Sequence, residues 1–379
     1  MKGWNEMLTL TPPMGWNSWN TFGAHISDKL IRETADALVE GGYRDAGYRY
    51  LVIDDCWSEK ERDKDGRLVP DAKKFPDGIK AVSDYVHGKG LKFGMYSCAG
   101  VRTCAGYPGS YGHEFVDAAT FAEWGVDFLK YDYCYKPEHA NGELLYRRMG
   151  MALKASGREI LFSACNWGTD DSGRWMRSAG ANMYRSTGDI FDNFKSFHDI
   201  ALSQTEKLCY SAPGCFNDLD MLIVGMYGKG NVGLGGCNDE EYRTHFALWC
   251  LFGSPLMIGC DIRSLSKESA VLLKNKELIA IDQDAECRPP FVAGKDGDRY
   301  CFAKQLANGD YAIGYFNFGD PENEIACLLS EVGLEPGSGF DMEMTDVFTG
   351  EKLGKFAEIC SCRVKAHGCR VLRAKLVKQ

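Results

Sequence analysis

Short apolar runs alternate with amphipathic stretches over residues 1–290. Eight of these runs have the length and composition of strands, at residues 13–16, 50–54, 92–97, 128–132, 160–164, 182–185, 220–224 and 256–259. Between them the apolar positions take helical spacing, as in residues 31–39 and 79–86. Brief apolar runs are typical of buried parallel strands, and eight strand–helix units close a barrel. The pattern therefore predicts an α/β fold, a (β/α)8 TIM barrel over residues 1–290.

The pattern changes after residue 290. Short β-rich runs follow at residues 300–305, 311–318, 340–348 and 362–376, and turn signals separate them. Asn308-Gly309 between the first two runs is a dipeptide typical of tight hairpins. Residues 291–379 are therefore predicted to form a C-terminal antiparallel β-sandwich domain, which packs directly on the barrel because no flexible linker separates the two.

Several of the apolar segments in the barrel region stop on an aspartate, namely at Asp54, Asp132, Asp189 and Asp220. In a barrel of this type the side chains at the C-terminal ends of the strands surround one pocket. Carboxylates that converge in a pocket without metal ligands are typical of sugar hydrolysis, which uses a pair of them.

Lys130 and Asp132 lie two residues apart in one strand, so both side chains point to the same face. A neighbouring cation favours an ionised carboxylate, and an ionised carboxylate is what a nucleophile at an anomeric carbon requires. The alternative is a structural ion pair at the barrel rim.

Asp189 is the candidate proton donor, with Arg185 four residues before it. The alternative for Asp189 is an N-cap of a following helix. Asp54 and Asp55 are candidates for binding sugar hydroxyls, and no loop with cation-ligand spacing accompanies them. Asp218 and Asp220 share a face, and turn capping is their alternative.

Tryptophans near the predicted strand ends offer faces on which a sugar ring can stack. These are Trp16, Trp19, Trp57 and Trp167. Packing in the core is the alternative for each of them, because most tryptophans are buried for that reason.

Composition excludes other classes of function. The formal net charge of −9 repels phosphate backbones and anionic lipids, and no basic cluster interrupts it, so we expect neither nucleic acid nor membrane as a partner. The 16 cysteines are scattered through apolar segments of a long chain, which predicts reduced core thiols. With no apolar core of signal-peptide length at residues 1–6, the sequence predicts a cytoplasmic protein.

Two motifs are discounted. Residues 228–233 match a dinucleotide fingerprint of glycines, but the run continues through Gly235 and Gly236 and does not open a helix. Cys360, Cys362, His367 and Cys369 do not have the spacing of a standard zinc site. We therefore predict no cofactor and no metal.

Eight short motifs, taken in their order along the chain, resemble those of a known family. They are Thr11 to Asn20, Asp54 to Trp57, Lys92 to Ser97, Thr103 to Gly106, Lys130 to Cys134, Arg185 to Asp189, Asn217 to Met221 and Ile258 to Asp261. Nearly end to end, the chain resembles glycoside hydrolase family 27, the α-galactosidase and α-N-acetylgalactosaminidase family.

The resemblance implies a metal-independent retaining exo-glycosidase that acts on small carbohydrates. Asp132 would be the nucleophile and Asp189 the acid/base. The galactose subsite would consist of Trp19, Asp54, Asp55, Tyr96, Cys104, Lys130, Asn166, Trp167, Arg185, Asp220 and Met221. The oligomeric state is left open.

Departures from the family refine these expectations. Ala24 and Ala181 stand where secreted members have disulfide partners for Cys56 and Cys165, whereas Cys104 and Cys134 are both kept. Asn166 is intermediate in size between the glutamate of animal α-galactosidases and the small residue of N-acetylgalactosaminidases, and we favour galactose. Asp54 argues against β-L-arabinopyranosidase activity, since relatives with that activity lack this carboxylate. A non-catalytic carbohydrate-binding protein is the alternative from another class, but it would be expected to have lost Asp132 or Asp189.

Overall fold

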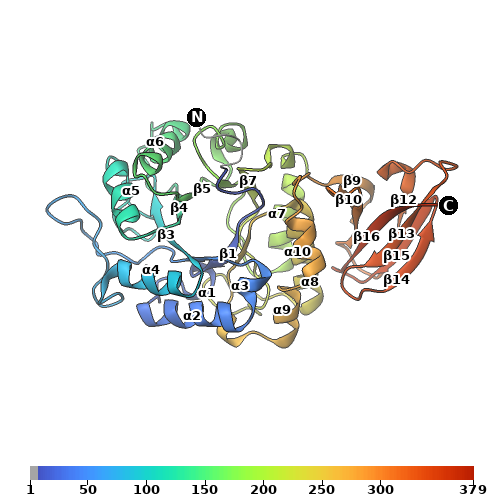
Figure 1. The fold of residues 1–379 in the computed structure, drawn as a ribbon, viewed down its shortest axis with the longest axis horizontal. Helices are drawn as coiled ribbons and strands as arrows, with labels where there is room; N and C mark the ends of the chain where they lie inside the picture. The colour runs from blue at the N-terminus through green and yellow to red at the C-terminus, as the bar shows by residue number, and fades with distance from the viewer. Residues whose placement is uncertain (1–6) are drawn as a thin grey trace.

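A computed structural model describes residues 7–379 of the protein. The chain forms a barrel followed by a β-sandwich (Figure 1). Eight parallel strands form the barrel sheet in the order β7-β6-β5-β4-β3-β2-β1-β8. Their bounds are β1 Met14–Asn17, β2 Tyr50–Val52, β3 Lys92–Cys98, β4 Phe128–Asp132, β5 Leu161–Cys165, β6 Met183–Arg185, β7 Phe216–Asp218 and β8 Leu256–Ile258. The predicted fold class is confirmed.

The seventh strand differs from the prediction. It occupies Phe216–Asp218 and not residues 220–224, because the chain turns immediately after it. Asp218 Oδ1 accepts a hydrogen bond from the backbone N–H of Asp220 at 2.9 Å, and Asp220 has a left-handed φ of 85°. Leu222 then makes an isolated parallel bridge to Ile258, which closes the barrel between β7 and β8.

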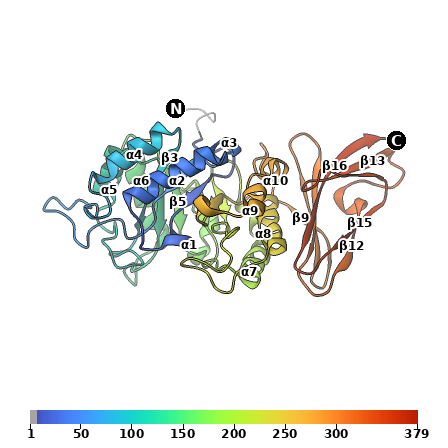
Figure 2. The same ribbon diagram turned by 90° about the horizontal axis from the view of Figure 1, so that it is seen from below.

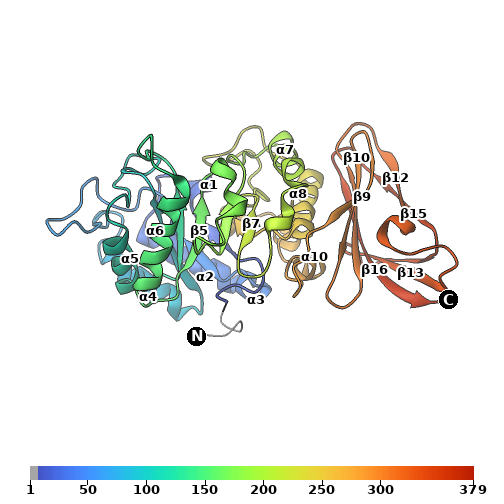
Figure 3. The same cartoon turned by 90° about the horizontal axis from the view of Figure 1, so that it is seen from above.

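Helices cover the outside of the barrel sheet (Figures 2 and 3). They are α2 Asp28–Glu40, α3 Tyr43–Ala46, α4 Gly78–Gly88, α5 Glu114–Glu123, α6 Gly142–Ala155, α7 Phe194–Gln204, α8 Asp239–Phe252, α9 Lys267–Leu272 and α10 Lys276–Asp282. The short α1 Trp19–Phe22 instead follows β1 at the C-terminal end of that strand. The two stretches with predicted helical spacing correspond to α2 and α4. Asn238 is the N-cap of α8 and forms a capping box with Glu241, in which the side chain of each residue accepts a hydrogen bond from the backbone N–H of the other.

The C-terminal domain has a six-stranded antiparallel sheet, β14-β13-β16-β11-β10-β9, and a two-stranded sheet, β12-β15. The bounds are β9 Phe291–Asp296, β10 Arg299–Gln305, β11 Tyr311–Asn317, β12 Asn323–Leu328, β13 Phe340–Asp346, β14 Lys352–Phe356, β15 Ile359–Val364 and β16 Cys369–Lys378. The run predicted at 362–376 is two strands, because a turn at residues 365–368 with His367 at a positive φ of 55° divides it.

Strand β9 begins at Phe291 and α10 ends at Asp282, so the two domains meet without a long linker. The sandwich lies against the α8 and α10 side of the barrel (Figure 1). At this contact Lys304 of β10 is fully buried and donates a hydrogen bond to the Ile281 carbonyl at 2.9 Å. Burial lowers the pKa of Lys304, and the carboxyl of the buried Asp282 acts in the opposite direction.

Among the described residues, none of the helices has the length and apolar character needed to cross a lipid bilayer. Residues 1–6, on which the prediction about the N-terminal segment rests, lie outside the described part of the chain.

Replacing Lys304 with alanine should lower the free energy of unfolding by about 3 kcal/mol, because it leaves the Ile281 carbonyl unbonded and Asp282 without its nearest compensating cation. Chemical denaturation monitored by tryptophan fluorescence would measure this. Lys365→Ala is the control, since Lys365 pairs with Glu240 at 3.4 Å on an exposed surface and should contribute less than about 1 kcal/mol. Equal effects of the two substitutions would contradict the role given to Lys304.

Candidate active site

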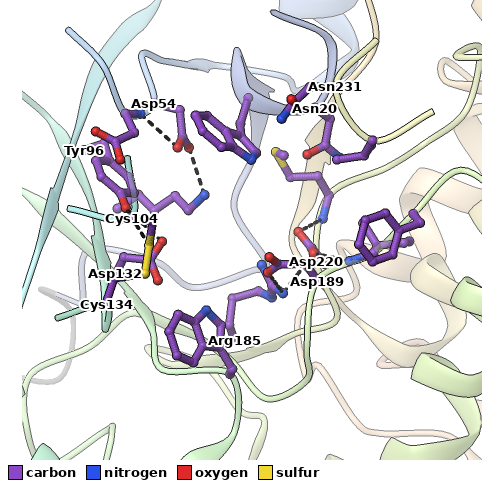
Figure 4. Close-up of a pocket in the computed structure, with 18 residues that line it drawn as sticks. Asn20, Asp54, Tyr96, Cys104, Asp132, Cys134, Arg185, Asp189, Asp220 and Asn231 are labelled. Atoms are coloured by element: carbon purple, nitrogen blue, oxygen red, sulfur yellow. Dashed lines mark hydrogen bonds and ion pairs between the residues drawn. A yellow bond between two sulfur atoms is a disulfide. The ribbon is translucent and has the colours of Figure 1, made fainter. Parts of the chain in front are cut away.

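One cavity of about 260 Å³ opens at the C-terminal ends of the barrel strands (Figure 4). Pockets for drug-sized ligands usually enclose roughly 300–1,000 Å³, so this cavity suits a single small ring. Its walls come from many elements, which explains why residues far apart in sequence meet there. The lining residues are Trp19, Asn20, Asp54, Asp55, Tyr96, Cys104, Lys130, Asp132, Cys134, Trp167, Arg185, Asp189, Ile190, Phe191, Asp220, Met221, Asn231 and Val232.

The predicted site residues come together in this cavity, with one exception. Asn166 does not line it. The Asn166 side chain is fully buried, and its Nδ2 donates to the Thr169 carbonyl at 2.8 Å, whereas its Oδ1 has no partner among the described residues. Asn166 therefore lies beside the cavity wall and not in its lining, and its role in sugar binding stays a prediction.

Asp132 ends β4 and lies deep in the cavity. Its Oδ2 accepts a hydrogen bond from the Tyr96 hydroxyl at 3.0 Å, and its Oδ1 accepts one from the backbone N–H of Tyr133 at 3.0 Å. Burial raises the pKa of Asp132 to about 6, against the opposing effect of the Lys130 ammonium. The carboxylate is thus oriented by two donors and is mostly ionised at neutral pH.

Lys130 favours the ionised form of Asp132, as predicted, and it also forms an ion pair with Asp54. Its ammonium lies 2.9 Å from Asp54 Oδ2, and it acts on Asp132 only through space. Asn17 Nδ2 donates to the same Asp54 oxygen at 2.7 Å. Burial opposes the charge on Lys130, but Asp54 and Asp132 raise its pKa, so the ammonium is retained.

Asp54 and Asp55 both face the cavity although they are adjacent. Asp55 Oδ1 accepts from the backbone N–H of Cys56, which has a positive φ of 70°, and Asp55 Oδ2 accepts from the N–H of Ala105 at 2.9 Å. This local turn after β2 brings the second carboxylate to the same side as the first. Burial raises the pKa of Asp55, and the two backbone donors oppose that effect.

Arg185 connects the second catalytic candidate to the barrel. Its Nη2 lies 3.0 Å from Asp189 Oδ1 and 2.9 Å from Asp220 Oδ2. The Asp189 side chain is 65% exposed, whereas Arg185 and Asp220 are buried. Asp189 does not cap a helix, because Asn193 is the N-cap of α7. Figure 4 shows Asp132 and Asp189 on different walls of the cavity.

Cys104 and Cys134 form a disulfide in the wall beside Asp132 (Figure 4). The remaining fourteen cysteines are free, and all of them except Cys209 are buried, as the prediction of core thiols requires. Within residues 7–379, Cys104, Asp132 and Cys134 are also the single group whose potential metal-ligand atoms gather closely. The two sulfur atoms are bonded to each other in this structure.

Other candidates take structural roles. Trp16 and Trp57 are core residues whose indole N–H groups donate to the carbonyls of Cys260 and Tyr96, whereas Trp19 and Trp167 line the cavity. Asp218 lies outside the cavity wall, and the turn-capping alternative describes its bond to the Asp220 N–H.

The discounted zinc candidates are distributed over the sandwich. Cys360 and Cys362 belong to its core, and Cys369 packs in the core shared with the barrel. His367 stacks on Phe194, with ring centroids 3.7 Å apart, and its Nδ1 lies 2.8 Å from Glu241.

Six lining residues were not predicted from the sequence: Asn20, Cys134, Ile190, Phe191, Asn231 and Val232. Ile190 and Phe191 follow Asp189 directly, and that adjacency was the signal available for them. Asn231 and Val232 lie inside the glycine run that was discounted as a dinucleotide motif. The run contributes to the cavity wall, and no phosphate-binding helix follows it directly.

The strand-end cavity is lined by several aspartates and by aromatic side chains, as in glycoside hydrolases, and the comparisons with known proteins show that this chain is one. Family models match the chain as "Alpha galactosidase A" over residues 11–284 and as "Alpha galactosidase C-terminal beta sandwich domain" over residues 296–374. The chain belongs to the α-galactosidase family, glycoside hydrolase family 27.

Individual relatives agree with this assignment. An α-galactosidase from Cyamopsis tetragonoloba is 43% identical over 96% of this chain and 86% of its own length. The crystal structure of α-galactosidase I from Mortierella vinacea superposes with a TM-score of 0.92 at 36% identity, covering 98% of each chain. A structure of the Saccharomyces cerevisiae enzyme with raffinose superposes with a TM-score of 0.89 at 29% identity, again covering 98% of each chain.

The raised pKa of Asp132 predicts an acidic limb near pH 6 in the pH profile of kcat/KM on an α-galactoside. The nucleophile role that the resemblance implies for Asp132 requires the ionised carboxylate, so activity should fall as the pH drops through about 6. Tyr96→Phe removes a donor to the ionised carboxylate and should move the limb upward by about half a unit. Asp218→Asn is the control, because burial also raises the pKa of Asp218 to about 6 but its carboxyl lies outside the cavity wall. If the limb moved with Asp218→Asn and not with Tyr96→Phe, the titrating group would not be Asp132.

Proposed function

We propose that this protein is a retaining exo-α-galactosidase that removes terminal α-linked galactose from oligosaccharides by double displacement. The observation that carries the proposal is the pair of carboxylates Asp132 and Asp189 on different walls of a cavity suited to one sugar ring. The cavity ends in a closed group of charged side chains, which fits an enzyme acting on the end of a chain.

In the first step Asp132 attacks the anomeric carbon and forms a glycosyl ester, while Asp189 gives its proton to the departing glycosidic oxygen. In the second step Asp189 takes a proton from water, the water oxygen bonds to the anomeric carbon, and the ester bond to Asp132 breaks. The exposure of Asp189 suits both steps, because the leaving group and then water must reach it from the cavity mouth.

We assign recognition of galactose to the part of the cavity wall around Asp54. Asp54 holds Lys130 and Asn17, and the two partners fix its carboxylate as an acceptor for a hydroxyl group of the sugar. By the family resemblance, Asp54 binds the 6-hydroxyl group of the sugar, which favours galactose over L-arabinose. Asn166 lies outside the cavity lining, so its effect on discrimination against N-acetylgalactosamine is left to the test below, and galactose remains the proposed sugar.

Initial rates on nitrophenyl α-galactoside, α-N-acetylgalactosaminide and β-L-arabinopyranoside test the sugar, and the α-galactoside should be the best substrate. Asp132→Asn should abolish turnover, since no nucleophile remains. Asp189→Asn should lose about 10²–10⁴-fold on substrates with poor leaving groups.

The stereochemistry is tested by proton NMR of the first sugar released. Retention gives α-galactose before mutarotation, and β-galactose as the first product would contradict double displacement. Absence of cleavage of all three glycosides would favour the carbohydrate-binding alternative.

We also propose a reducing compartment, the cytoplasm, as the site of action. The fourteen free cysteines, thirteen of them buried, support this, and Ala24 and Ala181 stand where secreted members of the family have disulfide partners for Cys56 and Cys165. Mass spectrometry of alkylated protein from its native cells should find these thiols free. Disulfides among them would place the protein in an oxidising compartment.

A further inference from the structure

Two loops meet at the mouth of the cavity. The first, residues 189–193, carries Asp189 and continues through Ile190 and Phe191 to the start of α7. The second, residues 227–237, is the glycine-rich run between β7 and α8, and it supplies Asn231 and Val232 to the cavity wall. We call the second segment the glycine loop. Neither loop contains a strand or a helix, so side-chain and backbone contacts must hold both.

Asp192 is the residue that joins the loops. It is fully buried, and its carboxylate accepts hydrogen bonds from the N–H of Gly228 at 2.7 Å, the N–H of Cys237 at 3.3 Å and the Tyr242 hydroxyl at 2.9 Å. Its backbone adds two more bonds, because its N–H donates to the Val232 carbonyl at 3.0 Å and its carbonyl accepts from the N–H of Gly236 at 2.8 Å. One residue thus holds both ends and the middle of the glycine loop.

The glycines make this arrangement feasible. A Cβ atom at Gly236 would lie 2.6 Å from the backbone nitrogen of Gly228, and Gly236 also has a positive φ of 85°. The glycine loop then docks on the barrel through Asn20, whose carbonyl accepts from the N–H groups of Asn231 at 2.7 Å and Val232 at 3.2 Å.

The segment before Asp192 is fixed from the barrel side. The Ile190 N–H donates to Asp220 at 2.8 Å, and Arg185 contacts Asp189 at 3.0 Å. The Phe191 ring lies at the cavity mouth and is 40% exposed. Asp189 and Phe191 therefore lie between two anchors, the Arg185–Asp220 pair and Asp192.

We propose that Asp192 is a positioning residue for general-acid catalysis, and that Phe191 and Asn231 form the subsite for the leaving group. This proposal rests on the role given to Asp189 under the proposed function. The aromatic face of Phe191 and the amide of Asn231 suit a neutral sugar, which offers an apolar ring face and hydroxyl groups. Asp192 holds this wall at a fixed position relative to Asp189, the acid that protonates the departing oxygen.

Asp192→Asn is the informative change because it preserves the shape of the side chain. An amide has one acceptor oxygen and one donor NH₂, so the NH₂ must face an N–H that the carboxylate formerly bound. At least one bond between the two loops is lost, and a buried donor is left unpaired.

The test is kcat/KM for a series of α-galactosides with increasingly poor leaving groups: fluoride, nitrophenyl, phenyl, methyl and the disaccharide melibiose. Fluoride departs with little help from an acid, whereas methanol and a sugar need full protonation. Asp192→Asn should change the fluoride rate little and should lose roughly ten- to a hundredfold on methyl galactoside and melibiose, a part of the 10²–10⁴ that a general acid supplies. A uniform loss across the series would overturn the positioning role.

Three further variants sharpen the test. Tyr242→Phe removes one donor and keeps the carboxylate, and it should show the same trend more weakly if Asp192→Asn folds poorly. Asp199→Asn is the matched control, since this carboxylate pairs with Lys195 on the exposed side of α7, and it should leave the series unchanged. Phe191→Ala should raise KM for melibiose several-fold and not for the fluoride. Equal KM changes on both substrates would overturn the leaving-group subsite.

The failure of this inference is distinguishable from failure of the proposed function. If the parent protein cleaves none of the α-galactosides, the proposed function is wrong. If the parent cleaves them and the Asp192→Asn loss does not depend on the leaving group, only the positioning role is wrong.

Discussion

The architecture of the site depends on keeping an excess of negative charge buried. Five largely buried aspartates, Asp54, Asp55, Asp132, Asp218 and Asp220, are accompanied by two cations in the cavity wall, the partly buried Lys130 and the buried Arg185. A buried charge is costly unless it is paired and hydrogen-bonded. Each cation therefore bridges elements that are distant in the sequence: Lys130 joins β4 to the end of β2, and Arg185 joins β6 to the turn after β7. Backbone N–H groups from tight turns provide the remaining stabilisation of the carboxylates.

The same imbalance suits the chemistry. Because cations are too few, burial raises the pKa values of Asp55, Asp132 and Asp220, yet Asp132 still ionises near pH 6. A cavity rich in acceptors binds the hydroxyl groups of a neutral sugar and also stabilises the positive charge that develops on the ring at the transition state. Asp189, outside this dense group, remains open to solvent and to the leaving group. Two carboxylates thus differ in environment because one is enclosed by the barrel and the other lies on a loop.

The sequence predicted what depends on strand periodicity and failed where loops decide the geometry. Asp54, Asp132 and Asp189 follow apolar runs, so their convergence followed from the barrel. The effect of Lys130 on Asp132 followed from their spacing, but the ion pair of Lys130 with Asp54 did not, because spacing along one strand cannot show that Asp54 approaches from two strands away. The seventh strand was misplaced because its apolar run continues past the turn at Asp220. Nothing in the sequence indicated that the Asn166 side chain would donate a hydrogen bond to the Thr169 carbonyl.

The glycine loop illustrates why a motif needs its structural context. Its spacing matches a dinucleotide fingerprint, in which glycines let a backbone approach a phosphate at the start of a helix. Here the same property serves another purpose, since the glycines let the two ends of one loop approach each other around the carboxylate of Asp192. The ligand of this glycine-rich backbone is thus a carboxyl group of the chain itself. Because Asp192 is three residues from Asp189, our proposal links the conformation of the glycine loop to the position of the proposed acid/base.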